Sequence, residues 1–332
     1  MALYSGGLDS ITSCRLIMAQ GIKVFAVRFV TPFFGYELLA REEEYIKEVA
    51  EKYGIDVRLK DISNKYLEML GNPAHGYGKN FNPCIDCKIM IATEARRMMG
   101  RLGASFIISG EVIGQRPMSQ RRDTLRIIER ESGCEDILLR PLCALNLKET
   151  LPEWEGLVDR SRLRGFSGRS RQPQMELAAS YGIEDYPSPA GGCVLTDPHM
   201  AARIRSFYEE NDLISTADIR LLMVGRHFRL PEGEWLVLGR NSRENDALLD
   251  LKQEGDIVLS PEDWPGPTAI LRGSGGEGSI KIAGGILKRY SKKDAGRLDS
   301  TIIYFKNNEE NQAVEKLDVS PLEAEVIEDW RR

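Results

Sequence analysis

The sequence predicts an α/β protein in which a domain built on a parallel sheet precedes a smaller α+β domain. Short apolar runs alternate with helical patterns over the first part of the chain, which is the rhythm of strand–helix–strand units. Past about residue 195 the pattern changes to short strands separated by glycine and proline, which indicates a separate β-rich domain. Parallel sheets bind ligands at the carboxyl ends of their strands, so we expect the functional motifs there.

The expected elements of the first domain alternate along the chain. Its strand segments lie at 2–5, 23–30, 56–62, 104–112 and 136–142, and its helical patterns at 11–20, 37–54 and 92–103. The second domain shows short strands at 234–241 and 267–273. We place the first domain at 1–195, a connecting segment at 196–224, the second domain at 225–306 and an acidic tail at 307–332. The tail is expected to be a solvated or peripheral helix.

Composition and charge restrict the class of protein. The chain has 332 residues, of which 42% are hydrophobic, enough for two or three domains with sizeable cores. It has no apolar run near the roughly 18 residues of a membrane span and no signal peptide, so we expect a cytoplasmic protein with no membrane partner. Its six cysteines are too sparse for a disulfide framework. The net charge of -5 argues against a uniformly basic surface but permits a local patch.

The hexapeptide SGGLDS, Ser5 to Ser10, joins the first strand to the first helix. Its consecutive glycines let backbone amide groups point inward, and the following helix start adds positive potential, which together form a nest for phosphate. Asp9 suits a Mg²⁺ ion that bridges phosphate oxygens. The alternative is a plain strand-to-helix turn, while a Walker-type loop is disfavoured because its G-x-x-x-x-G-K-[ST] sequence is absent. The predicted phosphate-binding residues are Ser5, Gly6, Gly7, Leu8, Asp9 and Ser10.

The stretch NPCIDCK, residues 82–88, places two cysteines three residues apart. If Pro83 begins a helix, Cys84 and Cys87 share one face, close to unpaired amide groups that favour thiolates. A metal site needs a further ligand, for which Cys193 in PSPAGGC is the strongest candidate. Three cysteines suit an iron–sulfur cluster with one iron left open, whereas structural zinc would want a fourth ligand.

Other readings of the cysteines and histidines stay open. Cys87 and Cys193 are also compatible with a catalytic pair in which one thiol carries a persulfide and the other resolves it. We expect Cys14 and Cys143 to be buried as small apolar residues, and Cys134 to be an exposed loop thiol. The three histidines are His75, His199 and His227, and we expect ordinary hydrogen-bonding or surface roles for them.

Together these motifs resemble the tRNA-thiolating branch of the PP-loop ATP pyrophosphatases, the 4-thiouridine and 2-thiouridine synthetases. SGGLDS is similar to the pyrophosphate-binding loop of that superfamily, and the stretches 109–120 and 140–142 are similar to segments of the 4-thiouridine synthetase catalytic domain. The resemblance covers about residues 1–195 and implies a Rossmann-like fold of the adenine nucleotide alpha hydrolase type. No THUMP-like region or rhodanese-like sulfur carrier is recognisable, and the short first strand is compatible with a trimmed N-terminus.

RNA capture is expected from basic stretches and from the second domain. We single out Arg116 in the first arginine-rich stretch, and in the second Arg160, Arg162, Arg164, Arg169 and Arg171 together with Phe166, a mixture suited to phosphate contacts and stacking. A solvated charge run is the alternative. Residues 225–300 resemble an NFACT-type RNA-binding module, and Arg240 and Asn241 fall in its GRN-x-x-END-like core.

The resemblance implies a reaction that uses ATP and Mg²⁺ to adenylate a uridine carbonyl of tRNA before sulfur displaces AMP. It leans toward 4-thiouridine at position 8, with Asp9, Cys84, Cys87 and Cys193 as catalytic residues and a [4Fe-4S] cluster on the three cysteines. Sulfide, or a donor protein such as a cysteine desulfurase, would supply the sulfur, and a homodimer is compatible with the family. Two other functions remain open: a different adenylating ligase, and a non-enzymatic RNA-binding factor that senses ATP.

Overall fold

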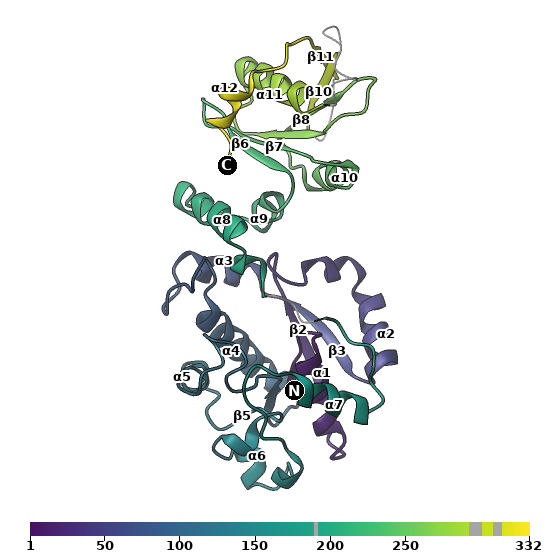
Figure 1. Ribbon diagram of the computed structural model, residues 1–332, viewed down its shortest axis with the longest axis vertical. Helices are drawn as coiled ribbons and strands as arrows, with labels where there is room; N and C mark the ends of the chain where they lie inside the picture. The colour runs from purple at the N-terminus through teal and green to yellow at the C-terminus, as the bar shows by residue number, and fades with distance from the viewer. Residues whose placement is uncertain (189–191, 292–300, 308–313) are drawn as a thin grey trace. The chain divides into compact units, whose positions relative to one another are not determined.

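The computed structural model describes residues 1–188, 192–291, 301–307 and 314–332. The chain divides into two compact units, Met1–Glu210 and Asn211–Arg332, whose boundary falls inside the predicted connecting segment (Figure 1). The predicted class is confirmed, because a parallel sheet forms the first unit and an antiparallel sheet the second. Within the described residues, no helix has the length and apolar character needed to cross a membrane.

The first unit is built on a five-stranded sheet in the order β3-β2-β1-β4-β5, with every neighbouring pair parallel. Its strands are β1 (Ala2–Leu3), β2 (Phe25–Val30), β3 (Asp56–Asp61), β4 (Ile107–Ser109) and β5 (Leu138–Leu139). Leu3 at the end of β1 pairs with Ser109 at the end of β4. The strand order reverses between β1 and β4, which is the point where open parallel sheets bind ligands.

Helices cover both faces of this sheet (Figure 1). The helices of the first unit are α1 (Leu8–Met18), α2 (Glu42–Tyr53), α3 (Ser63–Gly71), α4 (Cys84–Leu102), α5 (Arg122–Ser132), α6 (Leu151–Trp154), α7 (Gln172–Ser180) and α8 (Pro198–Glu210). Ala26 of β2 packs into a core with α1, α2 and α7, whereas its neighbour Val27 packs into a second core with α4. This alternation follows from the two-residue period of a strand, and it explains why β2 is apolar on both faces except at Arg28.

Buried thiols occur in both cores. Cys14 and Cys143 are buried, as predicted. The prediction for Cys134 is wrong, because this residue is 0% exposed and its thiol lies 3.7 Å from the carbonyl oxygen of Ala92 on α4. Gly133 ends α5 in a left-handed conformation and turns the chain inward, so a segment that is polar in sequence carries its cysteine into the core.

A buried ion network holds the β4 and β5 ends in place. The Arg140 side chain is 0% exposed, and its Nε donates to Glu111 Oε2 at 3.0 Å while its Nη1 contacts Glu129 of α5. Lys88 of α4 lies 3.4 Å from the second oxygen of Glu111. Burial alone would raise the pKa of Glu111, but Lys88 and Arg140 outweigh it and hold the pKa below its ordinary value.

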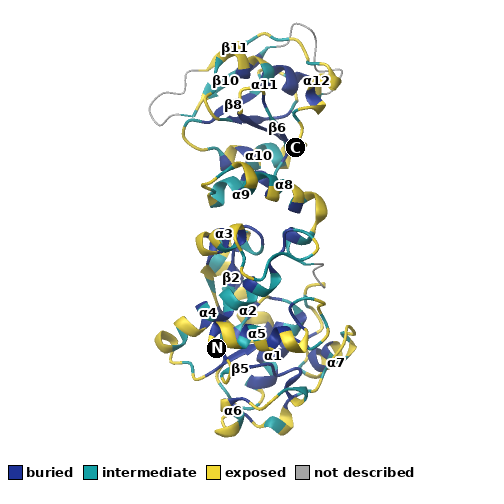
Figure 2. Cartoon of the chain, turned by 90° about the vertical axis from the view of Figure 1, so that its left-hand side faces the viewer, coloured by how far each residue is buried: buried dark blue, intermediate teal, exposed yellow. Residues whose placement is uncertain are grey.

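The second unit is a six-stranded sheet in the order β11-β10-β8-β9-β7-β6, and all its described pairs are antiparallel. Its strands are β6 (Arg226–Arg229), β7 (Trp235–Leu238), β8 (Ile257–Pro261), β9 (Ala269–Arg272), β10 (Ile302–Lys306) and β11 (Glu315–Leu317). The helices are α9 (Thr216–Leu222), α10 (Ser242–Leu251), α11 (Glu277–Tyr290) and α12 (Ala324–Glu328). The core lies between the sheet and α11, which buries Ile280, Ala283 and Leu287 (Figure 2).

The acidic C-terminal stretch is part of this unit rather than a separate tail. Its residues 308–313 lie outside the described part of the chain, but β11 pairs with β10 and Ile327 of α12 is 2% exposed. Arg332 donates its backbone N–H to the carbonyl oxygen of His227 on β6, at 3.0 Å. The charge count predicted a solvated or peripheral helix, because it could not register that a few apolar residues of this stretch, among them Leu317 and Ile327, pack against the core.

The GRN-x-x-END-like segment builds a helix start. Asn241 Oδ1 accepts from the backbone N–H of Glu244 at 3.0 Å and so caps α10. Arg240 forms an ion pair with Glu244 at 2.9 Å. Asn245 donates to the carbonyl of Gly266 and accepts from the N–H of Thr268. In this structure the motif residues hold α10 against the loop before β9.

We predict that Arg140→Met lowers the free energy of unfolding by about 3–5 kcal/mol, because Glu111 and Glu129 lose the guanidinium that offsets their burial. Urea denaturation of the full chain, followed by circular dichroism, measures the loss. The control is Arg130→Met on the same helix as Glu129, since the Arg130 side chain is 64% exposed and its pair contributes about 0–1 kcal/mol. Equal effects of the two substitutions would show that the network is not structural.

A second prediction concerns Asn241→Ala, which removes the α10 cap and is expected to cost about 1 kcal/mol of stability. Asn241→Asp keeps a capping oxygen and should retain most of that stability. Thermal unfolding of the two variants distinguishes a cap from an RNA contact. If both variants melt like the wild type, the cap does not stabilise the unit.

Candidate active site

The predicted phosphate-binding loop leads from β1 directly into α1. Gly6 has a φ of 77°, a left-handed conformation that favours glycine, and Gly7 occupies the N-cap of α1 without a side-chain cap bond. The Ser10 hydroxyl donates to the carbonyl oxygen of Gly7 at 2.8 Å and lies 3.3 Å from the Ser5 hydroxyl. The backbone N–H of Ser10 also bonds to the Gly7 carbonyl oxygen, at 3.0 Å, and that of Gly7 lies 3.4 Å from the Ser5 hydroxyl oxygen. The first amide groups of a helix have no acceptor one turn earlier, and the helix dipole attracts an anion to them.

The end of β4 packs against this loop through Gly110. A Cβ atom at Gly110 would lie 2.6 Å from both the carbonyl carbon and the carbonyl oxygen of Asp9. Backbone atoms cannot yield as a flexible side chain can, so only glycine allows this approach. The pairing of Leu3 with Ser109 brings the two segments together, since it aligns the ends of neighbouring parallel strands.

The Asp9 carboxylate is largely enclosed. Its Oδ2 accepts from Gln115 Nε2 at 3.2 Å and lies 3.9 Å from the Arg171 guanidinium. Burial raises the pKa of Asp9, while Arg171 and Gln115 act in the opposite direction. Its other oxygen, Oδ1, is buried without a hydrogen-bond partner. A buried carboxylate oxygen with no donor fits a hydrated Mg²⁺ ion, which takes one or two carboxylates together with waters and phosphate oxygens.

The three predicted metal-binding cysteines come together in the first unit. Cys84 is the first residue of α4, behind Pro83 at the N-cap, and Cys87 follows one turn later. Cys193 precedes the short helix η4 (Val194–Thr196), which is tied to the 72–83 loop by a bond from Asn80 to the Thr196 carbonyl. Residues 189–191, within the predicted PSPAGGC stretch, lie outside the described part of the chain. The thiols of Cys84 and Cys193 both act electrostatically on that of Cys87.

At Cys87, burial opposes the thiolate form that the helix-start amides were expected to favour. Burial raises the pKa of Cys87 to about 12, against the favourable charge of the adjacent Lys88, and neighbouring Cys193 and Cys84 raise it further. Burial also raises the pKa of Cys193. Desolvation outweighs the helix-start potential here. A bound metal would supply the charge that deprotonates such thiols.

The candidate metal ligands are the three cysteine sulfurs, because each of the three histidines lies elsewhere or has another partner. His75 pairs with Glu131 at 2.8 Å, His227 accepts from Trp235 Nε1 at 3.1 Å, and His199 is exposed on α8. Among the residues that the structure describes, no group of three His, Cys, Asp or Glu could hold one metal ion. A cluster binds each cysteine through a separate iron, so its ligands need not converge on one point. The three thiols fit that group better than a four-ligand zinc site.

Most of the predicted RNA-binding arginines have partners within the protein, whereas Arg116 and Arg169 are exposed. Arg160 is half-buried and donates to the carbonyls of Ala144 and Leu147 as well as to Glu153, which is a structural role. Arg162 donates to the Ala19 carbonyl and Arg164 to that of Arg162. Arg116 and Arg169 are exposed, and Arg240 is paired with Glu244. Arg171 points to Asp9 instead of toward solvent.

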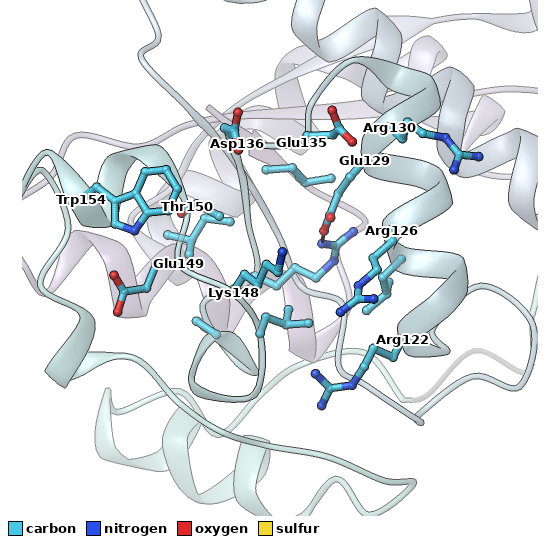
Figure 3. Close-up of a pocket in the computed structure, with 16 residues that line it drawn as sticks. Arg122, Arg126, Glu129, Arg130, Glu135, Asp136, Lys148, Glu149, Thr150 and Trp154 are labelled. Atoms are coloured by element: carbon cyan, nitrogen blue, oxygen red, sulfur yellow. Dashed lines mark hydrogen bonds and ion pairs between the residues drawn. The ribbon is translucent and has the colours of Figure 1, made fainter.

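A cavity of about 610 Å³ runs between α5 and the segment 144–154 beside β5, the edge strand of the sheet. Arg122 and Arg126 project from α5 toward Lys148, with Trp154 on the opposite wall (Figure 3). The Trp154 side chain is 63% exposed. Basic groups and an exposed indole are the kinds of side chain that contact phosphates and stack on bases, and four acidic residues, Glu129, Glu135, Asp136 and Glu149, line the same cavity.

Three neighbours of the site were not predicted from the sequence. Gln115 follows the end of β4, and its position after a strand in a parallel sheet was an available signal. No sequence signal pointed to Arg171 or Tyr66 as neighbours of the site, because each reaches it from a distant part of the chain. In sequence, Tyr66 has the pattern of an ordinary core residue of a helix.

Two family models match the chain. Residues 1–154 match the model described as thiamine biosynthesis protein (ThiI), and residues 225–331 match the model described as NFACT protein RNA binding domain. The second match extends through the acidic stretch that packs into the C-terminal sheet.

Curated relatives are named tRNA sulfurtransferases. A probable tRNA sulfurtransferase of Thermococcus kodakarensis is 26% identical over 178 residues, covering 53% of this chain and 43% of the relative. The tRNA sulfurtransferase of Psychromonas ingrahamii is 26% identical over 280 residues, covering 81% of this chain and 52% of the relative. The chain thus spans about half the length of these relatives.

Among solved structures, a 4-thiouridine synthetase–RNA complex with bound ATP aligns with 66% of this chain and 50% of its own, at 21% identity and a TM-score of 0.38. A likeness at that score is too loose to assign a site. The two family models have distinct ranges, one in each compact unit. The chain therefore contains a ThiI-family domain over residues 1–154 and an NFACT-type RNA-binding domain over residues 225–331.

Proposed function

We propose that the protein is an ATP-dependent tRNA sulfurtransferase that converts a uridine of tRNA, 4-thiouridine at position 8 being the favoured product. The observation that carries the proposal is the placement of two chemical groups on one sheet. The loop Ser5–Ser10 follows β1, and α4, whose first residue is Cys84, runs back toward β4 and so begins at the same carboxyl-end edge. The names of the curated relatives support the same class of reaction.

Activation of the uridine is assigned to the loop. The carbonyl oxygen attacks the α-phosphorus of ATP, an O–P bond forms, and the bond to the pyrophosphate oxygen breaks. Amide groups at the start of α1 would stabilise the negative charge that grows on pyrophosphate, and Asp9 would hold the Mg²⁺ ion that neutralises it. The product is an AMP ester of the uridine, whose oxygen has become a good leaving group.

Sulfur delivery is assigned to the cysteine site. A [4Fe-4S] cluster on Cys84, Cys87 and Cys193 would supply an open iron at which hydrosulfide binds. Hydrosulfide attack on the activated carbon forms the C–S bond and releases AMP with the former carbonyl oxygen, so this route needs no reductant. The alternative persulfide route through Cys87 and Cys193 ends in a disulfide and consumes two electrons per turnover.

Binding of tRNA is assigned to the NFACT-type domain together with basic groups of the first unit. Arg116 and Arg169 are exposed, and the cavity beside β5 adds Arg122, Arg126 and Lys148 facing Trp154. These groups support phosphate contacts with a salt-dependent affinity. The sulfur source, whether free sulfide or a donor such as a cysteine desulfurase, and the homodimer remain predictions.

The proposal predicts pyrophosphate release that depends on tRNA. Asp9→Asn should slow it at least 100-fold, because the variant loses the charge that holds the cation. The matched control is Asp123→Asn, an exposed carboxylate in the first turn of α5, which should release pyrophosphate at the wild-type rate. Pyrophosphate release that is equally fast without tRNA would point to another acceptor and overturn the proposal.

Iron content tests the cysteine assignment separately. Protein purified without oxygen should contain about four irons per chain, with acid-labile sulfide, as expected for one [4Fe-4S] cluster. Cys84→Ala, Cys87→Ala and Cys193→Ala should each lose both, whereas Cys134→Ala removes a buried thiol outside the site and should keep them. An iron-free wild type that still thiolates tRNA would contradict the cluster and favour the persulfide pair.

A further inference from the structure

Unpaired polar atoms gather around Asp9. Gln174 is 0% exposed, and its amide lies near enough to Asp9 to act on that carboxyl, yet neither its amide nitrogen nor its amide oxygen forms a hydrogen bond of ordinary length. Gln115 Oε1 and Asp9 Oδ1 are also buried without partners. Buried side-chain amides are nearly always satisfied, because leaving one unpaired costs the full penalty of desolvation. Such a cluster indicates that a polar ligand completes the hydrogen bonds.

Helix α7 carries Gln174 to this place. The helix packs against α1, and Leu177 and Ala178 on its inner face lie in the same core as Ile11 of α1. Gln174 lies three residues after Arg171, the N-cap of α7, so both reach the same side of the helix. Both also act on Asp9: the Arg171 guanidinium lies 3.9 Å from its Oδ2, and the Gln174 amide lowers the pKa of its carboxyl.

The chemistry of these atoms identifies the ligand class. Asp9 Oδ1, Gln115 Oε1 and Gln174 Oε1 are oxygen acceptors with no donor at ordinary hydrogen-bond length, the type of atom that binds a hydrated divalent cation. The Arg171 guanidinium is a planar donor suited to phosphate oxygens. A cation shell beside a phosphate-binding arginine, next to the loop Ser5–Ser10, matches the pyrophosphate end of a nucleoside triphosphate.

We infer that the N-terminal part of α7 forms a second wall of the ATP site, in which Arg171 binds the pyrophosphate portion of ATP and Gln174 positions Asp9 and the hydrated Mg²⁺ ion. This inference rests on the proposed function, since it takes ATP as the ligand of the loop. Both residues lie beyond residues 1–154, the part of the chain that matches the ThiI family model. Arg171 thus has a different role from Arg169, an exposed arginine of the same stretch that stays a candidate for RNA contact.

Calorimetric titration of the full chain with Mg·ATP, in the absence of tRNA, tests the inference. Arg171→Gln and Gln174→Met should each raise the Kd at least about 10-fold, as expected for lost hydrogen bonds to charged groups. Arg101→Gln and Gln172→Met are the matched controls, because both are exposed residues of the same types, Arg101 in the last turn of α4 and Gln172 next to Arg171. Both controls should keep the wild-type Kd.

Thermal unfolding without nucleotide gives an independent readout. Gln174→Met should raise the Tm, because an unpaired buried amide is replaced by an apolar chain of similar size. A lower Tm with an unchanged Kd would make Gln174 a structural residue and overturn the inference. Unchanged affinities for both α7 variants, with normal wild-type binding, would overturn the inference alone. A wild type that binds no Mg·ATP would overturn the proposed function as well.

Discussion

The site depends on the contact between the ends of β1 and β4 in the middle of a parallel sheet. The backbone of Asp9 lies so close to Gly110 that a Cβ atom there would clash with it. The pairing of Leu3 with Ser109 aligns the ends of the two strands. The loop Ser5–Ser10 takes its place from this contact. The start of α4 faces the same edge, because a helix that precedes β4 must run against the strands.

Charge and burial are balanced around this edge by residues from separate elements. Glu111, just after Gly110, is held ionised by Arg140 from the end of β5 and by Lys88, which follows Cys87 on α4. The same lysine opposes the rise in the pKa of the Cys87 thiol. One buried carboxylate thus joins the strand that supports the loop Ser5–Ser10 to the helix that carries Cys84 and Cys87. Its partners differ in exposure, since Arg140 is buried and Lys88 is half-buried.

Local patterns in the sequence predicted the strands, the loop and the three cysteines, because apolar periodicity and short motifs are properties of neighbouring residues. They failed where distant segments decide. A turn at Gly133 buries Cys134 under α4. Arg160 forms an ion pair with Glu153, and the Arg171 guanidinium lies 3.9 Å from the Asp9 carboxylate. Net charge along a stretch carries no information on which side chains find partners, so the arginine-rich run appeared uniform although its members differ.

The central claim is that the loop and the cysteines of the first unit act together on a uridine of tRNA. Mass spectrometry of nucleosides from unmodified tRNA, incubated without oxygen with the protein, Mg·ATP and sulfide, tests it most directly. We expect one uridine per tRNA in which sulfur replaces oxygen, and none when ATP is omitted. Sulfur-free uridines despite complete conversion of ATP to AMP and pyrophosphate would contradict it.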